Sequence, residues 1–218
     1  MESLRHPNIV MFLGACTKSP GNLVIVLEYC KNNCLWVLLQ NHNIPLPWEK
    51  RVSIAIDIAK GMQYLHGFST PVLHRDLKSL NILLDANLTP KIADFGWTRI
   101  LAEKMTLKVG TFQWMAPEVI KTKSYTEKAD IYSYGIILWE IASREAPYKT
   151  LNGYQVSVDV VEKKLRPTVL PEWPRPFTSL MERCWADDPT TRPNFKEILA
   201  ELRSIRQQMR RSTSEAGN

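Results

Sequence analysis

Two short apolar runs near the start of the chain are separated by turn-forming residues. Residues 9–13 read Ile-Val-Met-Phe-Leu and end at Gly14, and residues 23–27 read Leu-Val-Ile-Val-Leu. Residues 19–22 between them read Ser-Pro-Gly-Asn. Because β-branched residues favour strands and Pro, Gly and Asn favour turns, this pattern predicts a β-hairpin.

The pattern changes to helical spacing after Pro47. Residues 52–62 carry an apolar stripe, and Gly67 marks the expected end of that helix. Residues 127–143 are apolar on most sides of a helix, which predicts that this helix is buried. Residues 195–205 repeat the helical spacing after an N-cap at Asn194. The elements therefore predict an α+β protein with a mostly helical body.

The organisation along the chain follows from these elements. Residues 1–30 hold the strand pair, and residues 31–206 form the helical body. Residues 207–218 are polar, and we expect them to form a disordered tail.

Composition narrows the class of protein. With 218 residues, 44% hydrophobic and 23% charged, the chain can bury one sizeable core. No apolar stretch approaches the roughly 18 residues of a membrane span, and the N-terminus has no apolar signal core. The four cysteines lack zinc spacing, so we expect reduced thiols in a cytoplasmic protein.

The net charge of +6 is mild. Much of the basic excess lies late in the chain, where cations suit the last turns of a helix. We therefore expect neither a nucleic-acid partner nor a membrane partner. The late basic residues are Arg203, Arg206, Arg210 and Arg211.

Three short motifs carry the chemistry. Residues 74–81 read His-Arg-Asp-Leu-Lys-Ser-Leu-Asn, residues 94–96 read Asp-Phe-Gly, and residues 116–118 read Ala-Pro-Glu. One such motif alone is weak, but the ordered set is the protein-kinase signature. The chain therefore resembles the eukaryotic protein kinases. The resemblance implies a protein-kinase-like fold, with a mostly helical C-lobe and a remnant β-hairpin of the N-lobe in residues 1–30.

The same resemblance implies roles for the catalytic residues. Phosphoryl transfer needs a hydroxyl in line with the leaving oxygen and cations that absorb charge on the phosphates. Asp76 would be the base that accepts the hydroxyl proton, and Lys78 would reach the transferring phosphate. Asn81 and Asp94 would hold Mg²⁺, and ATP would be the phosphate donor.

The resemblance also places adenine against the end of the second predicted strand. Leu27 would be the gatekeeper, and the backbone of Glu28 and Cys30 would pair with adenine. Leu83 would lie under the ring, and Cys34 would rim the ribose end of the pocket. We expect a hinge-binding electrophile to label Cys34; the alternative is an unreactive packed thiol.

Two anchoring contacts are implied as well. Glu118 and Arg192 would form an ion pair that ties the activation segment to the helical lobe. Asp130 would hold the catalytic-loop backbone, because a buried carboxylate needs hydrogen-bond donors. The alternative is that Asp130 faces solvent near the start of its helix.

Regulation by phosphorylation is a further expectation. Arg75 precedes the candidate base, as in kinases that are switched on by a phosphate on the activation loop. Thr111 resembles a threonine that serine/threonine kinases place against the base, which leaves Thr106, then Thr98, as sites for an upstream kinase. The alternative is that both are solvated loop threonines.

Specificity is read from residues around these motifs. Lys78-Ser79 and Gly110-Thr111 resemble serine/threonine enzymes, whereas residues 114–118 and 132–140 resemble the tyrosine-kinase-like group of Raf-related and mixed-lineage kinases. We expect a kinase acting on Ser or Thr of protein substrates, and dual specificity stays open. The Ala-Pro-Glu segment is a peptide-docking feature in that family.

The chain contains no G-x-G-x-x-G-x-V and no V-A-I-K, the elements that cover and position ATP phosphates in kinases. We therefore interpret it as an N-terminally truncated kinase domain. The alternative is a non-catalytic kinase-like module that binds partners or regulates a full kinase. The complete set of Asp76, Lys78, Asn81 and Asp94 favours a catalytic parent.

Overall fold

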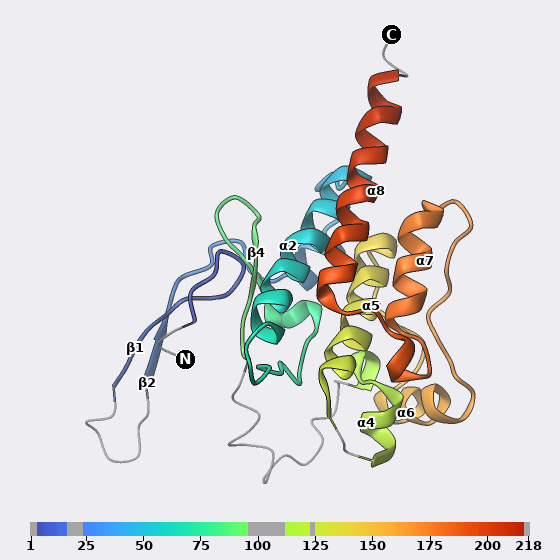
Figure 1. The fold of residues 1–218 in the computed structure, drawn as a ribbon, viewed down its shortest axis with the longest axis horizontal. Coiled ribbons are helices and arrows are strands. Elements are labelled where there is room, and N and C mark those ends of the chain that lie inside the picture. Colours follow the sequence, from blue (N-terminus) through green and yellow to red (C-terminus); the bar gives the residue numbers. More distant parts are fainter. Residues whose placement is uncertain (1–3, 17–23, 96–111, 123–124, 216–218) are drawn as a thin grey trace.

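A computed structural model describes residues 4–16, 24–95, 112–122 and 125–215 (Figure 1). Two strands stand apart from a body of helices, and a second small sheet joins the two parts. The strands are β1 (Phe12–Cys16), β2 (Val24–Leu27), β3 (Ile82–Leu84) and β4 (Pro90–Ile92). The helices are α1 (Leu35–Gln40), α2 (Trp48–His66), α4 (Pro117–Thr122), α5 (Glu127–Ser143), α6 (Gly153–Glu162), α7 (Arg175–Cys184) and α8 (Phe195–Glu215), with single 3₁₀ turns η1 (Ser79–Asn81), η2 (Phe112–Trp114) and η3 (Pro189–Thr191).

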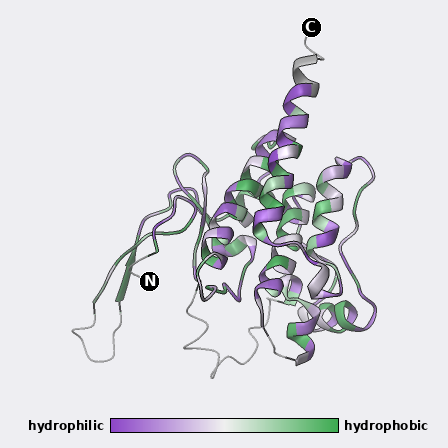
Figure 2. Ribbon diagram, viewed as in Figure 1, coloured by the Kyte–Doolittle hydropathy of each residue, from purple (hydrophilic) through white to green (hydrophobic). Residues whose placement is uncertain are grey.

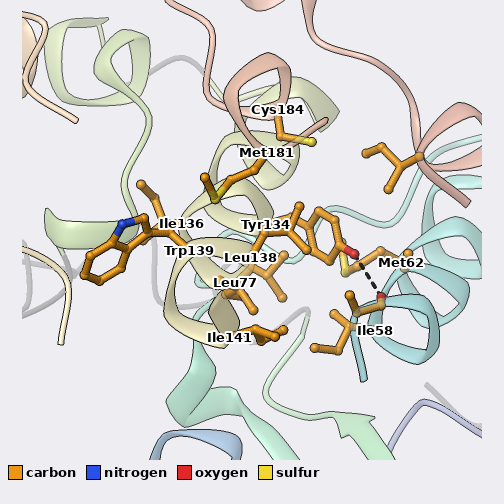
Figure 3. Close-up of a cluster of buried hydrophobic side chains, with 14 of the residues drawn as sticks. Ile58, Met62, Leu77, Tyr134, Ile136, Leu138, Trp139, Ile141, Met181 and Cys184 are labelled. Carbon is orange, nitrogen blue, oxygen red and sulfur yellow. Dashed lines mark hydrogen bonds between the residues drawn. The ribbon is translucent and has the colours of Figure 1, made fainter. Parts of the chain in front are cut away.

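The centre of the helical body is α5, as the all-round apolar pattern predicted. Residues 129–142 of this helix are all buried, and α2 and α7 pack against it. Tyr134 crosses from α5 to α2, where its hydroxyl donates to the Ala55 carbonyl at 2.9 Å (Figure 3). Figure 3 also shows Ile58 and Met62 of α2 beside this contact. A helix with so little polar surface is stable only inside such a core.

The last helix is longer than the sequence predicted. The expected disordered tail from residue 207 is wrong as far as Glu215, because α8 continues to that residue. Its apolar stripe extends through Ile205 to Met209, which still packs against the core, and so the helix has a partner beyond residue 207. The end of α8 projects past the other helices and is mostly hydrophilic (Figures 1 and 2).

The predicted hairpin is present, with its first strand shifted. β1 begins at Phe12 rather than at residue 9, and β1 pairs with β2 in antiparallel register. Ile9 instead forms a parallel bridge with Ile92 of β4, and the Val10 amide donates to the Ile92 carbonyl at 2.9 Å. The predicted turn at residues 19–22 lies outside the described residues.

This junction depends on a close approach between the N-terminal segment and α2. The Ile92 amide donates to the Asn8 carbonyl at 2.9 Å, and the Asn8 side chain donates to the Pro90 carbonyl at 3.0 Å. A Cβ atom on Gly61 of α2 would lie only 2.7 Å from the Asn8 carbonyl oxygen. The absence of a side chain at Gly61 therefore lets the N-terminal segment and β4 reach the helix.

In the part of the chain that the structure describes, no helix is both long and apolar enough to cross a bilayer.

Candidate active site

The turn before β3 brings three of the proposed catalytic side chains together. The Lys78 ammonium lies 2.7 Å from Oδ2 of Asp76. The Asn81 amide donates to the same oxygen at 3.0 Å and to the Asp76 backbone carbonyl at 2.8 Å. The 3₁₀ turn η1 supplies the curvature that lets Asn81 reach back to Asp76.

The backbone of this turn is fixed by a buried carboxylate in α5. Asp130, which is fully buried, accepts hydrogen bonds from the amides of His74 at 2.9 Å and Arg75 at 3.0 Å. The expectation that Asp130 holds the catalytic-loop backbone is confirmed, and the solvent-facing alternative is wrong. Arg75 adopts a positive φ of 68°, a conformation that costs energy for a side chain with a Cβ. The two hydrogen bonds stabilise that strained turn.

Two further side chains complete the environment of Asp130. His66 of α2 contacts it at 2.8 Å, and the Tyr125 hydroxyl donates to it at 2.6 Å. Burial alone would raise the pKa of Asp130, but the hydrogen bond and charge of His66, together with further contacts that include the Tyr125 hydrogen bond, outweigh it, so that the pKa is lowered. Asp130 therefore stays ionised, and burial lowers the pKa of the adjacent His74 so that this ring is neutral near pH 7.

Asp94 follows β4 and is brought beside the same turn. The Ala93 amide donates to the Asn81 carbonyl at 2.9 Å, so that the chain enters Asp94 next to the end of the catalytic loop. Asp94 is exposed with a positive φ of 58°, whereas the following Phe95 is buried. Asp76, Asn81 and Asp94 thus lie on adjoining segments rather than scattered over the molecule.

Some of the residues that would line an adenine pocket lie where the segment after β2 meets β3. Cys34 forms an antiparallel bridge with Leu83, and the Asn32 amide donates to the Leu84 carbonyl at 3.0 Å. Leu27 is the last residue of β2, and its side chain is 36% exposed.

Two of these residues have local partners of their own. The Glu28 carboxylate accepts from the Met11 amide at 2.8 Å and pairs with Lys91 at 3.0 Å, so that the residue after β2 is tied to the residue before β1 and to β4. Burial, followed by the charge of Glu28, raises the pKa of the Cys30 thiol. Cys34 is only 6% exposed, which favours the packed-thiol alternative over ready labelling.

The expected anchor between Glu118 and Arg192 is confirmed. The Arg192 guanidinium donates to both carboxylate oxygens of Glu118, at 2.6 and 2.9 Å. Arg192 is 1% exposed and also donates to the carbonyls of Ala186 and Lys128. The ring of Tyr132 lies 5.1 Å from this guanidinium. All these contacts fix the start of α4 against α5 and the loop before α8.

The wider family follows from comparison with known proteins. A family model described as protein tyrosine and serine/threonine kinase matches residues 1–202. The chain belongs to this kinase family. Its mostly helical body and small β1–β2 hairpin are those of a kinase domain, as the three motifs predicted.

Curated relatives of this kinase chain carry kinase names. It is 45% identical over 210 residues to "Probable serine/threonine-protein kinase drkC" of Dictyostelium discoideum, covering 94% of the chain and 28% of that relative. It is 44% identical over 207 residues to "Serine/threonine-protein kinase STY17" of Arabidopsis thaliana, covering 94% and 36%. "Dual specificity protein kinase shkA" of Dictyostelium discoideum is 41% identical over 212 residues, covering 94% and 40%. The chain thus spans well under half the length of these relatives.

Three residues that bind the turn around Asp76, or bind Asp130, were not predicted from the sequence. Glu140 of α5 is fully buried and bonded to Ser79 and Trp114, although the sequence analysis gave it no role. His66 and Tyr125, which bind Asp130, were missed as well. Glu140 had a signal, since a lone acid inside an apolar helix needs donors just as Asp130 does.

The residues expected to take part in regulation are only partly described. Thr98, Thr106 and Thr111 lie outside the described residues. Arg75, the residue expected to pair with a phosphate there, is half-buried at the turn before Asp76.

Proposed function

We propose that this chain belongs to a protein serine/threonine kinase that transfers the γ-phosphate of ATP to Ser or Thr hydroxyls of protein substrates. The observation that carries the proposal is the contact set around Asp76. One carboxylate oxygen, Oδ2, receives both the Lys78 ammonium at 2.7 Å and the Asn81 amide at 3.0 Å. Among the contacts of the described residues, Oδ1 is left for an incoming hydroxyl.

This arrangement suits proton abstraction from a hydroxyl. Asp76 orients the hydroxyl through Oδ1 and accepts its proton as the oxygen attacks phosphorus. Lys78 is tethered to Oδ2, so its positive charge stays beside the site of attack and stabilises negative charge on the transferring phosphate. The two side chains leave the loop on either side of Leu77, whose burial holds their spacing.

Asn81 and Asp94 fit a divalent cation by the chemistry of their donors. The Asn81 amide nitrogen is engaged by Asp76, which leaves its amide oxygen as a ligand, and Asp94 is an exposed carboxylate on the adjoining segment. Hard oxygen donors suit Mg²⁺. Bound there, the ion would neutralise charge on the ATP phosphates. No three His, Cys, Asp or Glu side chains gather as a metal group within the described ranges.

The remaining assignments rest on motif and relatives. Adenine is proposed to contact Leu27, the backbone of Glu28 and Cys30, and Leu83, with Cys34 at the ribose end. Lys78-Ser79 and the serine/threonine names of drkC and STY17 favour Ser/Thr acceptors. The dual-specificity name of shkA makes tyrosine phosphorylation a measurable alternative. Phosphorylation of Thr106 or Thr98 by an upstream kinase and a cytoplasmic location, suggested by the reduced cysteines, stay predictions.

A second candidate is a non-catalytic kinase-like module. The 218 residues themselves contain neither a glycine-rich loop nor a V-A-I-K strand. Such a module would use the same fold to bind a partner kinase rather than to transfer phosphate.

The experiment is phosphate transfer from labelled ATP to a Ser/Thr peptide library, with Mg²⁺ and with EDTA. We expect transfer by the unmodified chain that Asp76→Asn lowers by about 10²–10⁴-fold, the contribution of a general base held in place. Asp85→Asn is the control, because Asp85 caps a turn after β3. Equal transfer by Asp76→Asn would contradict the proposal, and no transfer from folded protein that also fails to bind ATP would favour the module.

A further inference from the structure

A groove lies where the segment before β1, helix α2 and helix α8 meet, and we call it the α2–α8 groove. The two helices pack side by side (Figure 1). The last turn of α2 contributes Tyr64, and Phe68 follows just after the helix. His6 lines the groove from the segment before β1 and Arg203 lines it from α8, around a volume of about 590 Å³. Within the described ranges, its lining residues are all distinct from those of the candidate active site.

Three aromatic rings stand in a row along this groove. His6 stacks on Tyr64 with ring centroids 5.1 Å apart, and Phe68 packs edge-on against Tyr64 at 5.2 Å. The Asn8 amide donates to Nδ1 of His6 at 3.0 Å, which holds that ring in place. The Tyr64 hydroxyl accepts from the Arg5 amide at 3.2 Å. Because Phe68 is also 39% exposed, the rings present a fixed apolar surface that another large side chain can cover.

The rim of the groove on α8 is cationic. Arg203 is exposed, and Glu201, the acid nearest to it along α8, pairs with Arg183 instead. Arg206 and Arg210 follow Arg203 at helical spacing. Residues three and four apart lie on the same side of a helix, so these arginines form one row that starts at the groove.

Acidic residues do little to balance this charge. Lys60 of α2 pairs with Asp57 at 2.8 Å, so this pair brings no net charge. No acid is among the residues that line the groove in the described part of the chain. Burial, followed by the charge of Lys60, lowers the pKa of His6, so that its ring is neutral near pH 7. The α2–α8 groove thus joins an apolar surface to arginine charge that no lining acid balances.

We propose that the α2–α8 groove is a docking site for an acidic peptide segment of a partner protein, in which an aromatic side chain is flanked by Asp or Glu. The aromatic side chain covers Tyr64 and Phe68, while the flanking carboxylates face Arg203 and the arginines beyond it. The apolar surface alone would not select among peptides, whereas the arginines disfavour basic ones. The proposal does not depend on phosphate transfer, and it holds for a catalytic domain and for a kinase-like module alike.

A membrane and a nucleic acid suit this surface less well. A bilayer presents a flat face, whereas the rings lie in a recess between two helices and the segment before β1. Nucleic-acid affinity comes mainly from many phosphate contacts, and here the arginines form a single short row on one helix. A recess beside a short charged row fits one side chain of a peptide and its neighbours.

The experiment is fluorescence anisotropy of the full chain with labelled peptides that carry Phe, Tyr or Trp between glutamates. We expect saturable binding that weakens as salt is raised, because the arginines are exposed. Arg203→Glu weakens binding about tenfold, since an attraction becomes a repulsion. Phe68→Ala weakens it about fivefold through the lost ring contact. A peptide with lysine in place of glutamate regains affinity for Arg203→Glu, because the charges are again opposite.

Two variants are matched controls. Arg175→Glu reverses an exposed arginine at the start of α7. Leu170→Ala shortens an apolar side chain that is 41% exposed, close to the exposure of Phe68. Neither residue lines the groove, and we expect both variants to bind the acidic peptides as the unmodified chain does.

The absence of saturable binding by all of these peptides overturns the proposal, and so does equal weakening by Arg203→Glu and Arg175→Glu. Equal binding of a peptide with alanine in place of the aromatic residue overturns it too, because charge alone would then be recognised. Phosphatidylserine vesicles and a single-stranded RNA are titrated in parallel. Binding of either one that Arg203→Glu abolishes, with no peptide binding, would assign the surface to that class of partner and contradict the proposal.

Discussion

At the scale of single residues, the two buried acids of α5 differ in their hydrogen-bond donors and in their pKa. Asp130 has four donors and a lowered pKa, whereas Glu140 has two donors and a raised one. Both acids lie inside the apolar helix α5, and the sequence alone predicts only that each buried carboxyl group needs hydrogen-bond donors. The difference in pKa follows from the hydrogen-bond donors and from the nearby histidine charge that only Asp130 has, and both depend on tertiary contacts.

The pKa of Glu140 predicts how stability changes with pH. Its folded pKa of about 8 lies above the ordinary value of 4.5, so the folded state binds the proton more tightly than the unfolded state. The contribution of Glu140 is therefore fully present below pH 4.5 and is lost as pH rises towards 8. Urea unfolding of the unmodified chain and of Glu140→Gln from pH 5 to 8.5 measures this. We expect the unmodified chain to lose a few kcal/mol relative to Glu140→Gln, and a constant difference would contradict the shift.

The Arg192 anchor makes a second prediction at this scale. Arg192→Ala leaves Glu118 and three backbone carbonyls without this donor, and we expect a loss of about 3–5 kcal/mol in the free energy of unfolding. Arg183→Ala is the control, since Arg183 pairs with Glu201 on the surface and such pairs contribute about 0–1 kcal/mol. Chemical denaturation measures both, and similar losses for the two variants would count against a buried anchor.

At the scale of elements, the spacing of hydrophobic residues predicted the bounds of helices better than the bounds of strands. The buried helix at residues 127–143 was predicted with the bounds that α5 has. The first strand was misplaced because Ile9 and Val10 are buried beside β4, where their backbone pairs with Ile92 rather than with β2. A local hydrophobic pattern indicates that a residue is buried, but it does not indicate which distant segment packs against that residue.

The candidate site likewise contains residues that a local motif predicts and residues that come from distant segments. Asp76, Lys78 and Asn81 are close in sequence, so a motif with fixed spacing was enough to predict their grouping. The partners that hold them come from α2, from α5 and from the residues before α5, and no spacing rule connects those segments to the loop. Only Asp130 was expected, and that expectation came from family resemblance.

The contact between α2 and the N-terminal segment gives a prediction about elements. Gly61→Ala would place a Cβ atom 2.6 Å from Cδ1 of Ile92 and 2.7 Å from the Asn8 carbonyl oxygen. The backbone oxygen cannot move without breaking its bond to the Ile92 amide, so we expect a loss of about 1–3 kcal/mol. Gly14→Ala is the control, because nothing lies within 4 Å of its Cβ position. Thermal unfolding compares them, and an unchanged midpoint for Gly61→Ala would refute the close approach.

At the scale of the whole molecule, the helical body and the β1–β2 hairpin differ in how much of their apolar surface is buried. The helical body buries most of its large apolar residues, whereas the β1–β2 hairpin extends away from it in Figure 1. Leu13 is 56% exposed and Val24 and Val26 about half exposed, on a sheet of two strands. Two-stranded sheets are marginal in water, and exposed edges with apolar side chains pair readily with other chains.

This imbalance predicts that the isolated chain self-associates through the hairpin. Val26→Lys places a charge on the exposed strand, where it opposes edge-to-edge pairing without disturbing the helical core. We expect sedimentation velocity to show concentration-dependent oligomers for the unmodified chain and mostly monomer for Val26→Lys, with the same thermal midpoint. Val158→Lys on α6 is the control, since that valine is similarly exposed but belongs to a helix, which offers no unpaired strand edge. Equal monomerisation by both variants would point to a general effect of added charge, and persistence of oligomers in Val26→Lys would place the association elsewhere.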